Sequence, residues 1–169
     1  KNDTLSKLNL VKERPENKHY TLHIADNSDV LKYVPNIALR ARKLIQNAWP
    51  GPLTLIFALE PEDIKIQQTK LGKETFSILY KEGTIGVRCP DNPVATALLK
   101  QTKCPVVAPS ANISDQPPAV NADQVLEQLD GKIEMVLDAG QCKFQKSSTV
   151  AKITNRGIEI FREGAYSKM

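Results

Sequence analysis

Residues 83–100 read GTIGVRCPDNPVATALLK, and this stretch decides the fold class. Residues 83–89 are predicted to form a strand, because polar and apolar side chains alternate over residues 84–89 and leave an apolar face of Ile85, Val87 and Cys89. Pro90 ends the alternation, and Asp91 and Pro93 then provide an N-cap and a first-turn proline for a helix. A strand followed directly by a helix favours an α/β fold.

The same patterns recur on both sides of this unit. Helices are predicted over residues 5–11, 36–49 and 121–129, and strands over residues 20–25, 53–59, 104–108, 134–137, 148–153 and 158–161. Residues 154–157, TNRG, form a predicted hairpin turn between the last two strands. This order, without repeats or linkers, predicts one α/β domain over residues 1–169.

The composition excludes several classes of protein. Of 169 residues, 41% are apolar and 25% charged, which is typical of a soluble globular domain. No apolar run approaches the roughly 20 residues that span a bilayer, so we expect no membrane segment. The net charge of +4 suits an anionic partner such as a nucleotide or tRNA, although solvated lysines explain it equally well.

The cysteines and histidines bear on compartment and metal binding. The three cysteines, Cys89, Cys104 and Cys142, form no CxxC pair and predict a reduced, cytoplasmic setting. His19 and His23 lie four residues apart, but the segment between them alternates like a strand, so we predict no metal site on the protein.

Two basic positions interrupt the apolar pattern. Lys12 and Arg14 lie two apart before Pro15, where an ammonium and a guanidinium could converge on phosphate oxygens or simply form a solvated loop. Arg88 ends a mostly apolar strand, where burial is costly without an anionic partner. That partner is either a substrate carboxylate or a structural Asp or Glu.

Polar side chains also follow predicted strands. In residues 106–112, VVAPSAN, Ser110 and Asn112 stand at a strand's carboxyl end, where open α/β sheets bind ligands, although both side chains could also serve their own turn. Ser148 and Arg162 likewise lie at strand ends. The sequence has neither GxxxxGK[ST] nor GxGxxG, and no histidine near Ser110, so a hydrogen-bonding role for this serine is favoured over a nucleophilic one.

Taken together, these strings resemble the YrdC/Sua5 family of L-threonylcarbamoyladenylate synthases. The family marker, Lys-x-Arg followed much later by Ser-x-Asn, matches residues 12–14 and 110–112. Three further strings follow the family order: WPGPLT at residues 49–54, IGVRCP at 85–90 and STV at 148–150. The resemblance runs from about residue 8 to residue 165.

The resemblance implies a twisted mixed sheet with flanking helices and a deep, basic concave face. It also implies the formation of threonylcarbamoyl-AMP and pyrophosphate from L-threonine, bicarbonate and ATP for the t6A modification of tRNA. Mg²⁺ would bridge the phosphate oxygens, with no metal ligand supplied by the protein. A t6A transfer complex would be the downstream partner, and tRNA a further one.

Residue roles carry over from the matching motifs. Lys12 and Arg14 would clamp the ATP triphosphate, and Ser110 and Asn112 would complete this catalytic set. The further nucleotide contacts would be Thr84 and Arg162. The implied threonine-binding residues are Thr21, Arg88 and Ser148.

The sequence departs from the family in two places. His19-Tyr20 stands where the family usually has Pro-Leu. The family also opens with a strand and a Pro-Thr-Asp-Thr-x-Tyr-Gly-Leu motif that the sequence in hand does not contain. We therefore expect the domain to lack its N-terminal strand and part of the threonine pocket.

Two other functions stay open at this point. The basic face could hold tRNA or double-stranded RNA without chemistry, in which case binding should fade steeply with salt. A related carbamoyl-adenylate domain of hydrogenase maturation would use carbamoyl phosphate instead, although such domains normally sit in much larger chains.

Overall fold

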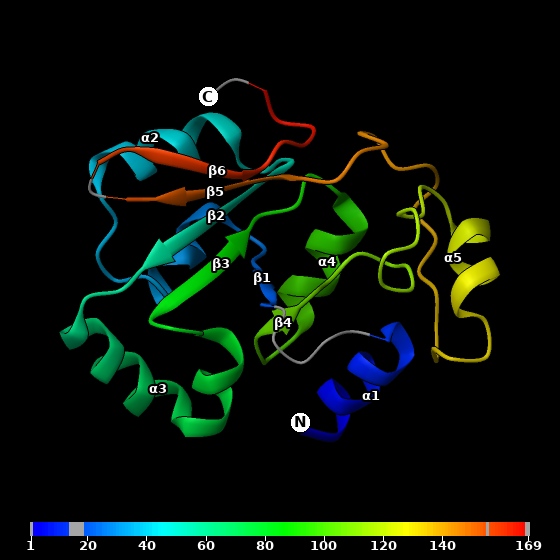
Figure 1. Cartoon of the computed structure of the whole chain (residues 1–169), viewed down its shortest axis with the longest axis horizontal. Helices are drawn as coiled ribbons and strands as arrows, with labels where there is room; N and C mark the ends of the chain where they lie inside the picture. Colours follow the sequence, from blue (N-terminus) through cyan, green and yellow to red (C-terminus); the bar gives the residue numbers. More distant parts are fainter. Residues whose placement is uncertain (1, 14–18, 155, 168–169) are drawn as a thin grey trace. The chain divides into compact units, whose positions relative to one another are not determined.

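A computed structural model describes residues 2–13, 19–154 and 156–167, and they group into two compact units (Figure 1). The sheet unit comprises residues 19–108 together with the last segment from residue 148. The first unit comprises the helix that ends at Lys12 and residues 109–147. One domain over residues 1–169 stays a prediction.

The sheet unit is built on six strands. They are β1 (Thr21–His23), β2 (Leu53–Ala58), β3 (Thr84–Arg88), β4 (Val106–Val107), β5 (Thr149–Ile153) and β6 (Ile158–Arg162). Their order across the sheet is β4-β1-β3-β2-β5-β6 (Figure 1). β1 pairs with β3 and β2 with β5 in parallel, while the other pairs are antiparallel. The predicted mixed α/β sheet is confirmed, together with the β5–β6 hairpin.

Four helical segments accompany the sheet. They are the 3-10 helix η1 (Asn27–Lys32), α2 (Leu39–Ala48), α3 (Pro61–Leu79) and α4 (Pro93–Gln101). Helix α3 is not among the elements predicted from the sequence, although Pro61 begins it and two acidic residues occupy its first turn. The side chain of Asn92 caps α4 by accepting a hydrogen bond from the Ala95 amide, so the expected Asp91 cap is wrong.

One face of the sheet forms the hydrophobic core. Leu22, Leu55, Val87 and Ala151, from four adjacent strands, are each at most 1% exposed. They belong to one buried cluster with side chains of α2. This packing confirms the alternation predicted for residues 84–89. The opposite face of the sheet, called here the polar face, carries the alternate residues of these strands, which include Thr21, His23, Thr54, Gly86 and Arg88.

The first unit contains two helices, α1 (Asn2–Lys12) and α5 (Ala122–Leu129). Asn121 caps α5 by accepting a hydrogen bond from the Gln124 amide. The strand predicted over residues 134–137 is wrong. This segment pairs with no strand among the described residues, and Met135 and Leu137 stay 74% and 54% exposed. An apolar run without a partner strand does not form a ladder.

Candidate functional site

The position of Arg88 at the carboxyl end of β3 is fixed by the turn that precedes β2. Its Nε donates a hydrogen bond to the Gly51 carbonyl at 3.1 Å, and the Gly51 amide donates to the Cys89 carbonyl at 2.9 Å. A Cβ at Gly51 would lie 2.2 Å from the Ala48 carbonyl oxygen, so only glycine fits there. The conformation of the WPGP segment therefore sets the direction of the Arg88 side chain.

A hydroxyl network lies on the same polar face, on β2, β5 and β6. Thr54 and Ser148 are 4% and 7% exposed, and their hydroxyl oxygens are 3.0 Å apart. The Arg162 guanidinium donates to the Ser148 carbonyl at 2.9 and 3.1 Å and to its hydroxyl at 3.2 Å. The structure thus brings Ser148 and Arg162 together and adds Thr54.

Thr21 and Thr84 both lie on this face by strand alternation, but Thr84 is remote from Arg88. Thr21 pairs with Gly86 in the β1–β3 register, two residues before the His23–Arg88 pair. Thr84 begins β3 at the opposite end from Arg88, roughly 13 Å away at the usual strand rise. Its hydroxyl donates to the Lys81 carbonyl at 2.9 Å, within a turn. The structure therefore gives Thr84 a local structural contact.

His23 pairs with Arg88 across the β1–β3 ladder. Burial lowers the pKa of His23 to about 4, and the positive charge of Arg88 adds to that shift. Its Nδ1 lies 3.2 Å from the Thr21 carbonyl oxygen, which can only accept, so we assign the proton of the neutral ring to Nδ1. A neutral imidazole therefore stands beside the guanidinium at neutral pH.

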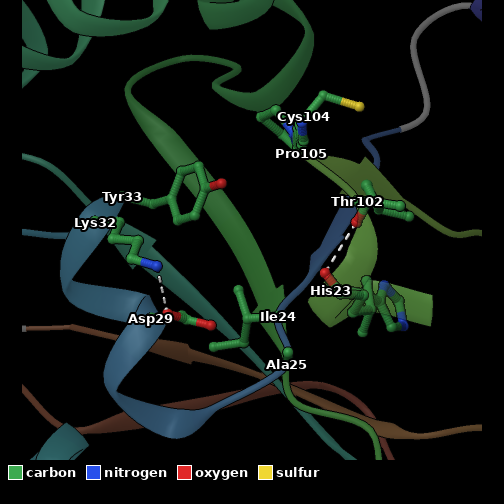
Figure 2. Close-up of a pocket in the computed structure, with 12 residues that line it drawn as sticks. His23, Ile24, Ala25, Asp29, Lys32, Tyr33, Thr102, Cys104 and Pro105 are labelled. Carbon is green, nitrogen blue, oxygen red and sulfur yellow. Dashed lines mark hydrogen bonds and ion pairs between the residues drawn. The ribbon is translucent and has the colours of Figure 1, made fainter. Parts of the chain in front are cut away.

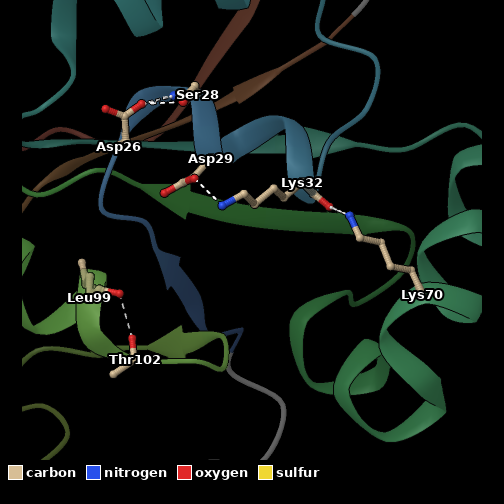
Figure 3. A network of polar contacts seen from close by, with 7 residues as sticks. All are labelled: Asp26, Ser28, Asp29, Lys32, Lys70, Leu99 and Thr102. Atoms are coloured by element: carbon tan, nitrogen blue, oxygen red, sulfur yellow. Dashed lines mark hydrogen bonds and ion pairs between the residues drawn. The ribbon is translucent and has the colours of Figure 1, made fainter.

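A cavity of about 290 Å³ opens next to His23, at the β4 edge of the sheet unit. Figure 2 shows Tyr33 and the Asp29–Lys32 ion pair on one side of it, with Thr102 and Cys104 on the other. Figure 3 shows that several of these polar groups have partners within the chain: Asp29 pairs with Lys32 at 2.6 Å, and the Thr102 hydroxyl donates to the Leu99 carbonyl at 2.9 Å. The lining does not point to one class of ligand.

In the first unit, Lys12 organises the Ser-x-Asn loop. Lys12 is 3% exposed, and its Nζ donates to the carbonyl oxygens of Ser110 and Asn112. The Asn112 amide group donates to the carbonyls of Ile113 and Gln116 at 2.9 and 2.7 Å, as a turn-forming asparagine would. Its buried Oδ1 has no donor among the described residues. Lys12, Ser110 and Asn112 are thus brought together.

Arg14 lies outside the described residues. Among those the structure describes, no three His, Cys, Asp or Glu side chains form a group that could hold a metal. Within the same ranges, no helix is both long and apolar enough to cross a bilayer.

Sequence reasoning missed Thr54 and His23 as members of the polar face. The sequence does contain a signal for Thr54. It is the last residue of WPGPLT, and strand alternation places it on the opposite face from the apolar Leu53 and Leu55. His23 carries no local signal for this role beyond its spacing from His19. Its neighbour Arg88 comes from β3, and that pairing is not encoded locally.

Comparison with known proteins now decides the family. The family model Sua5_yciO_yrdC, described as "Telomere recombination", matches residues 1–164. The chain belongs to the Sua5/YciO/YrdC family. The resemblance found in the Lys-x-Arg and Ser-x-Asn strings is confirmed.

Two relatives of this Sua5/YciO/YrdC chain are both named threonylcarbamoyl-AMP synthase. The chain is 32% identical over 166 residues to the threonylcarbamoyl-AMP synthase of Bacillus subtilis, covering 98% of the chain and 45% of the relative. It is 33% identical over 167 residues to that of Schizosaccharomyces pombe, covering 98% and 37%. The chain therefore spans less than half the length of these two relatives.

A solved structure supports the same fold. The crystal structure of Pyrococcus abyssi Sua5 complexed with L-threonine superposes with a TM-score of 0.79 at 29% identity, covering 96% of this chain and 44% of that one. The six-stranded mixed sheet is therefore the family fold. A deep, basic concave face remains a prediction.

Proposed function

We propose that this chain forms threonylcarbamoyl-AMP and pyrophosphate from L-threonine, bicarbonate and ATP, for the t6A modification of tRNA. The observation that carries the proposal is the match of 98% of the chain to a relative named threonylcarbamoyl-AMP synthase. The polar face supports it, because an arginine, a neutral histidine and several hydroxyls gather there in place of a nucleophilic triad.

The amino acid is the substrate that the sheet unit suits best. Arg88 would pair its guanidinium with the threonine carboxylate, since its Nε contact with Gly51 sets its direction. Thr21 and Ser148 would provide hydroxyls for the amine and side chain. In this proposal Ser148 depends on Arg162 for its orientation, because both its carbonyl and its hydroxyl accept from that guanidinium.

ATP is assigned to the Lys12–Ser110–Asn112 loop together with Arg14. Lys12 would act in two ways, through its positive charge near the phosphates and by holding the loop through two carbonyls. The unpartnered Oδ1 of Asn112 supports a ligand contact at this loop. Thr84 is not part of the proposed nucleotide site, because its hydroxyl already donates a hydrogen bond to the Lys81 carbonyl.

The chemistry requires positioning rather than a protein nucleophile. The threonine amine and bicarbonate condense to a carbamate with loss of water. A carbamate oxygen then attacks the α-phosphorus of ATP, the bond to the bridging oxygen breaks, and pyrophosphate leaves. Because the described residues offer no metal cage, Mg²⁺ would enter as part of the substrate MgATP. Positively charged side chains then stabilise the charge that develops on the phosphates.

The adenylate product carries an activated threonylcarbamoyl group. We propose that a separate transfer complex passes this group to tRNA, in a cytoplasmic setting consistent with three free cysteines.

The test is pyrophosphate release by the whole protein with each substrate omitted in turn. We expect release only when threonine, bicarbonate and MgATP are all present. Replacing threonine and bicarbonate with carbamoyl phosphate should give none. Release without threonine, or equal release with carbamoyl phosphate, would contradict the proposal. RNA binding that fades steeply with salt, without turnover, would favour the RNA-binding alternative.

A further inference from the structure

Gly86 occupies a position where the fold does not need a glycine. It lies in the middle of β3, paired with Thr21 on one side and Ile56 on the other. Its φ is not in the left-handed region that favours glycine. Glycine within a strand weakens it and often marks the close approach of a ligand or another backbone.

Packing does not explain the glycine either. A Cβ at position 86 would have the Thr21 hydroxyl oxygen and the Tyr20 carbonyl oxygen at 3.8 Å, and the Thr54 Cγ2 at 4.0 Å. These are ordinary van der Waals distances, unlike the 2.2 Å contact that a Cβ at Gly51 would make. An alanine would therefore fit at position 86, and packing among the described residues does not require the glycine.

The space that a Cβ at position 86 would fill is called here the hollow, and it lies on the polar face beside Thr21 and Thr54. Gly86 is only partly buried, so this spot is open to a ligand. Thr21 stands on one side of it and Thr54 on the other, and Thr54 is held by Ser148. Arg88 lies two residues further along the same face, roughly 7 Å from Gly86 at the usual strand rise.

We propose that Gly86 is a specificity-determining residue, whose absent side chain makes room for the side chain of the amino-acid substrate. This inference rests on the proposed function and on Arg88 as the carboxylate partner. With the carboxylate held by Arg88, the β-carbon and its methyl group lie over the hollow, between the two threonine side chains. A methyl group added at position 86 then competes with the substrate's own methyl group.

The experiment compares Gly86→Ala with wild type, using threonine and serine as alternative substrates. Serine lacks the methyl group, so it should tolerate a smaller hollow. We expect Gly86→Ala to raise KM for threonine roughly tenfold, the usual effect of one methyl group in a fitted pocket. The threonine-to-serine ratio of kcat/KM should fall by a similar factor. The melting temperature should equal or exceed that of wild type, since alanine fits the strand.

Gly157→Ala is the matched control. Its added Cβ would lie 3.7 Å from Arg40 Nη1, again an ordinary contact, and its φ is also outside the left-handed region. It lies between β5 and β6, outside the polar face. This variant should keep both KM values of wild type.

Each outcome bears on the inference. A Gly86→Ala protein that melts like wild type and keeps its threonine KM and its threonine-to-serine ratio would overturn it. A melting temperature lowered by more than about 5 °C would also overturn it, because the strand would then need the glycine. Failure of the wild type to use threonine would instead refute the proposed function.

Discussion

Thr54 and Ser148 are separated by 94 residues in the chain, yet their buried hydroxyl oxygens lie 3.0 Å apart at the starts of two parallel strands. The Leu53–Thr149 register of β2 and β5 produces this contact. The Arg162 guanidinium then fixes Ser148 from β6. Thr54, Ser148 and Arg162 therefore form one network within the polar face, in which Ser148 contacts both of the others.

This network predicts coupled effects on stability. Thr54→Val should lower the free energy of unfolding by about 1 kcal/mol, because it removes the Thr54–Ser148 hydrogen bond. Ser148→Ala should lower it further, because it removes the same bond and also the contact of the hydroxyl with Arg162. The double variant should lose less free energy of unfolding than the two single variants together, because either change alone already breaks the bond that the two residues share. Urea unfolding of the four proteins measures the coupling. Strictly additive losses would mean that the two hydroxyls do not interact.

Arg88 should control threonine affinity. Both Arg88→Ala and Arg88→Lys should raise KM for threonine, the first by about 10- to 100-fold, the range expected for a hydrogen bond to a charged group. Lysine keeps the charge but loses the planar fork and the contact with Gly51, so it should rescue only in part. Arg40→Ala removes an exposed charge on α2 and is the control. The measurement is KM for threonine from steady-state kinetics at saturating ATP. An unchanged KM in Arg88→Ala would show that this residue does not bind threonine.

Lys12 should hold the Ser-x-Asn loop as well as act on ATP. Lys12→Met removes the donor to two carbonyls from a buried position, so amides in residues 109–116 should exchange hydrogen faster. We also expect pyrophosphate release to fall by about 100-fold or more, as when one stabilising donor is lost from a charge-stabilising site. Lys7→Met is the control. Lys7 pairs with Glu134 on the surface, and such pairs contribute at most about 1 kcal/mol. Unaltered exchange in Lys12→Met would show that the loop does not need this ammonium.

His23 should make stability depend on pH. Its pKa is lowered from 6.5 to about 4 in the folded protein, so the unfolded chain binds a proton first as pH falls. The contribution of neutral His23 is complete above pH 6.5 and is lost as pH falls from 6.5 to about 4, by about 2–3 kcal/mol. His23→Gln should reduce the slope of unfolding free energy against pH in this window. Equal slopes in both proteins would contradict the assignment.

The strands of the sheet could be predicted because their alternation is local. Residues 84–89 alternate in sequence and again in burial, and β2 and β5 start within one residue of their predicted bounds. The segment 134–137 is also largely apolar, but it pairs with no strand among the described residues. Pairing cannot be deduced from a short apolar run alone.

Only those residues of the candidate site that belong to sequence motifs could be predicted. Lys12, Ser110 and Asn112 come together as the family strings imply. Thr54 and His23 become site residues through strand pairing, with Ser148 and Arg88 respectively. Thr84 shares a face with Arg88 by alternation, but its distance along β3 and its turn contact appear only in three dimensions.

The most direct test of the account is to identify the product. The protein is incubated with L-threonine, MgATP and ¹³C-bicarbonate, and the reaction is analysed by mass spectrometry. We predict an adenylate that contains threonine and a single ¹³C atom, formed in step with pyrophosphate. Pyrophosphate without that labelled adenylate, or an adenylate without the ¹³C atom, would contradict the proposed function.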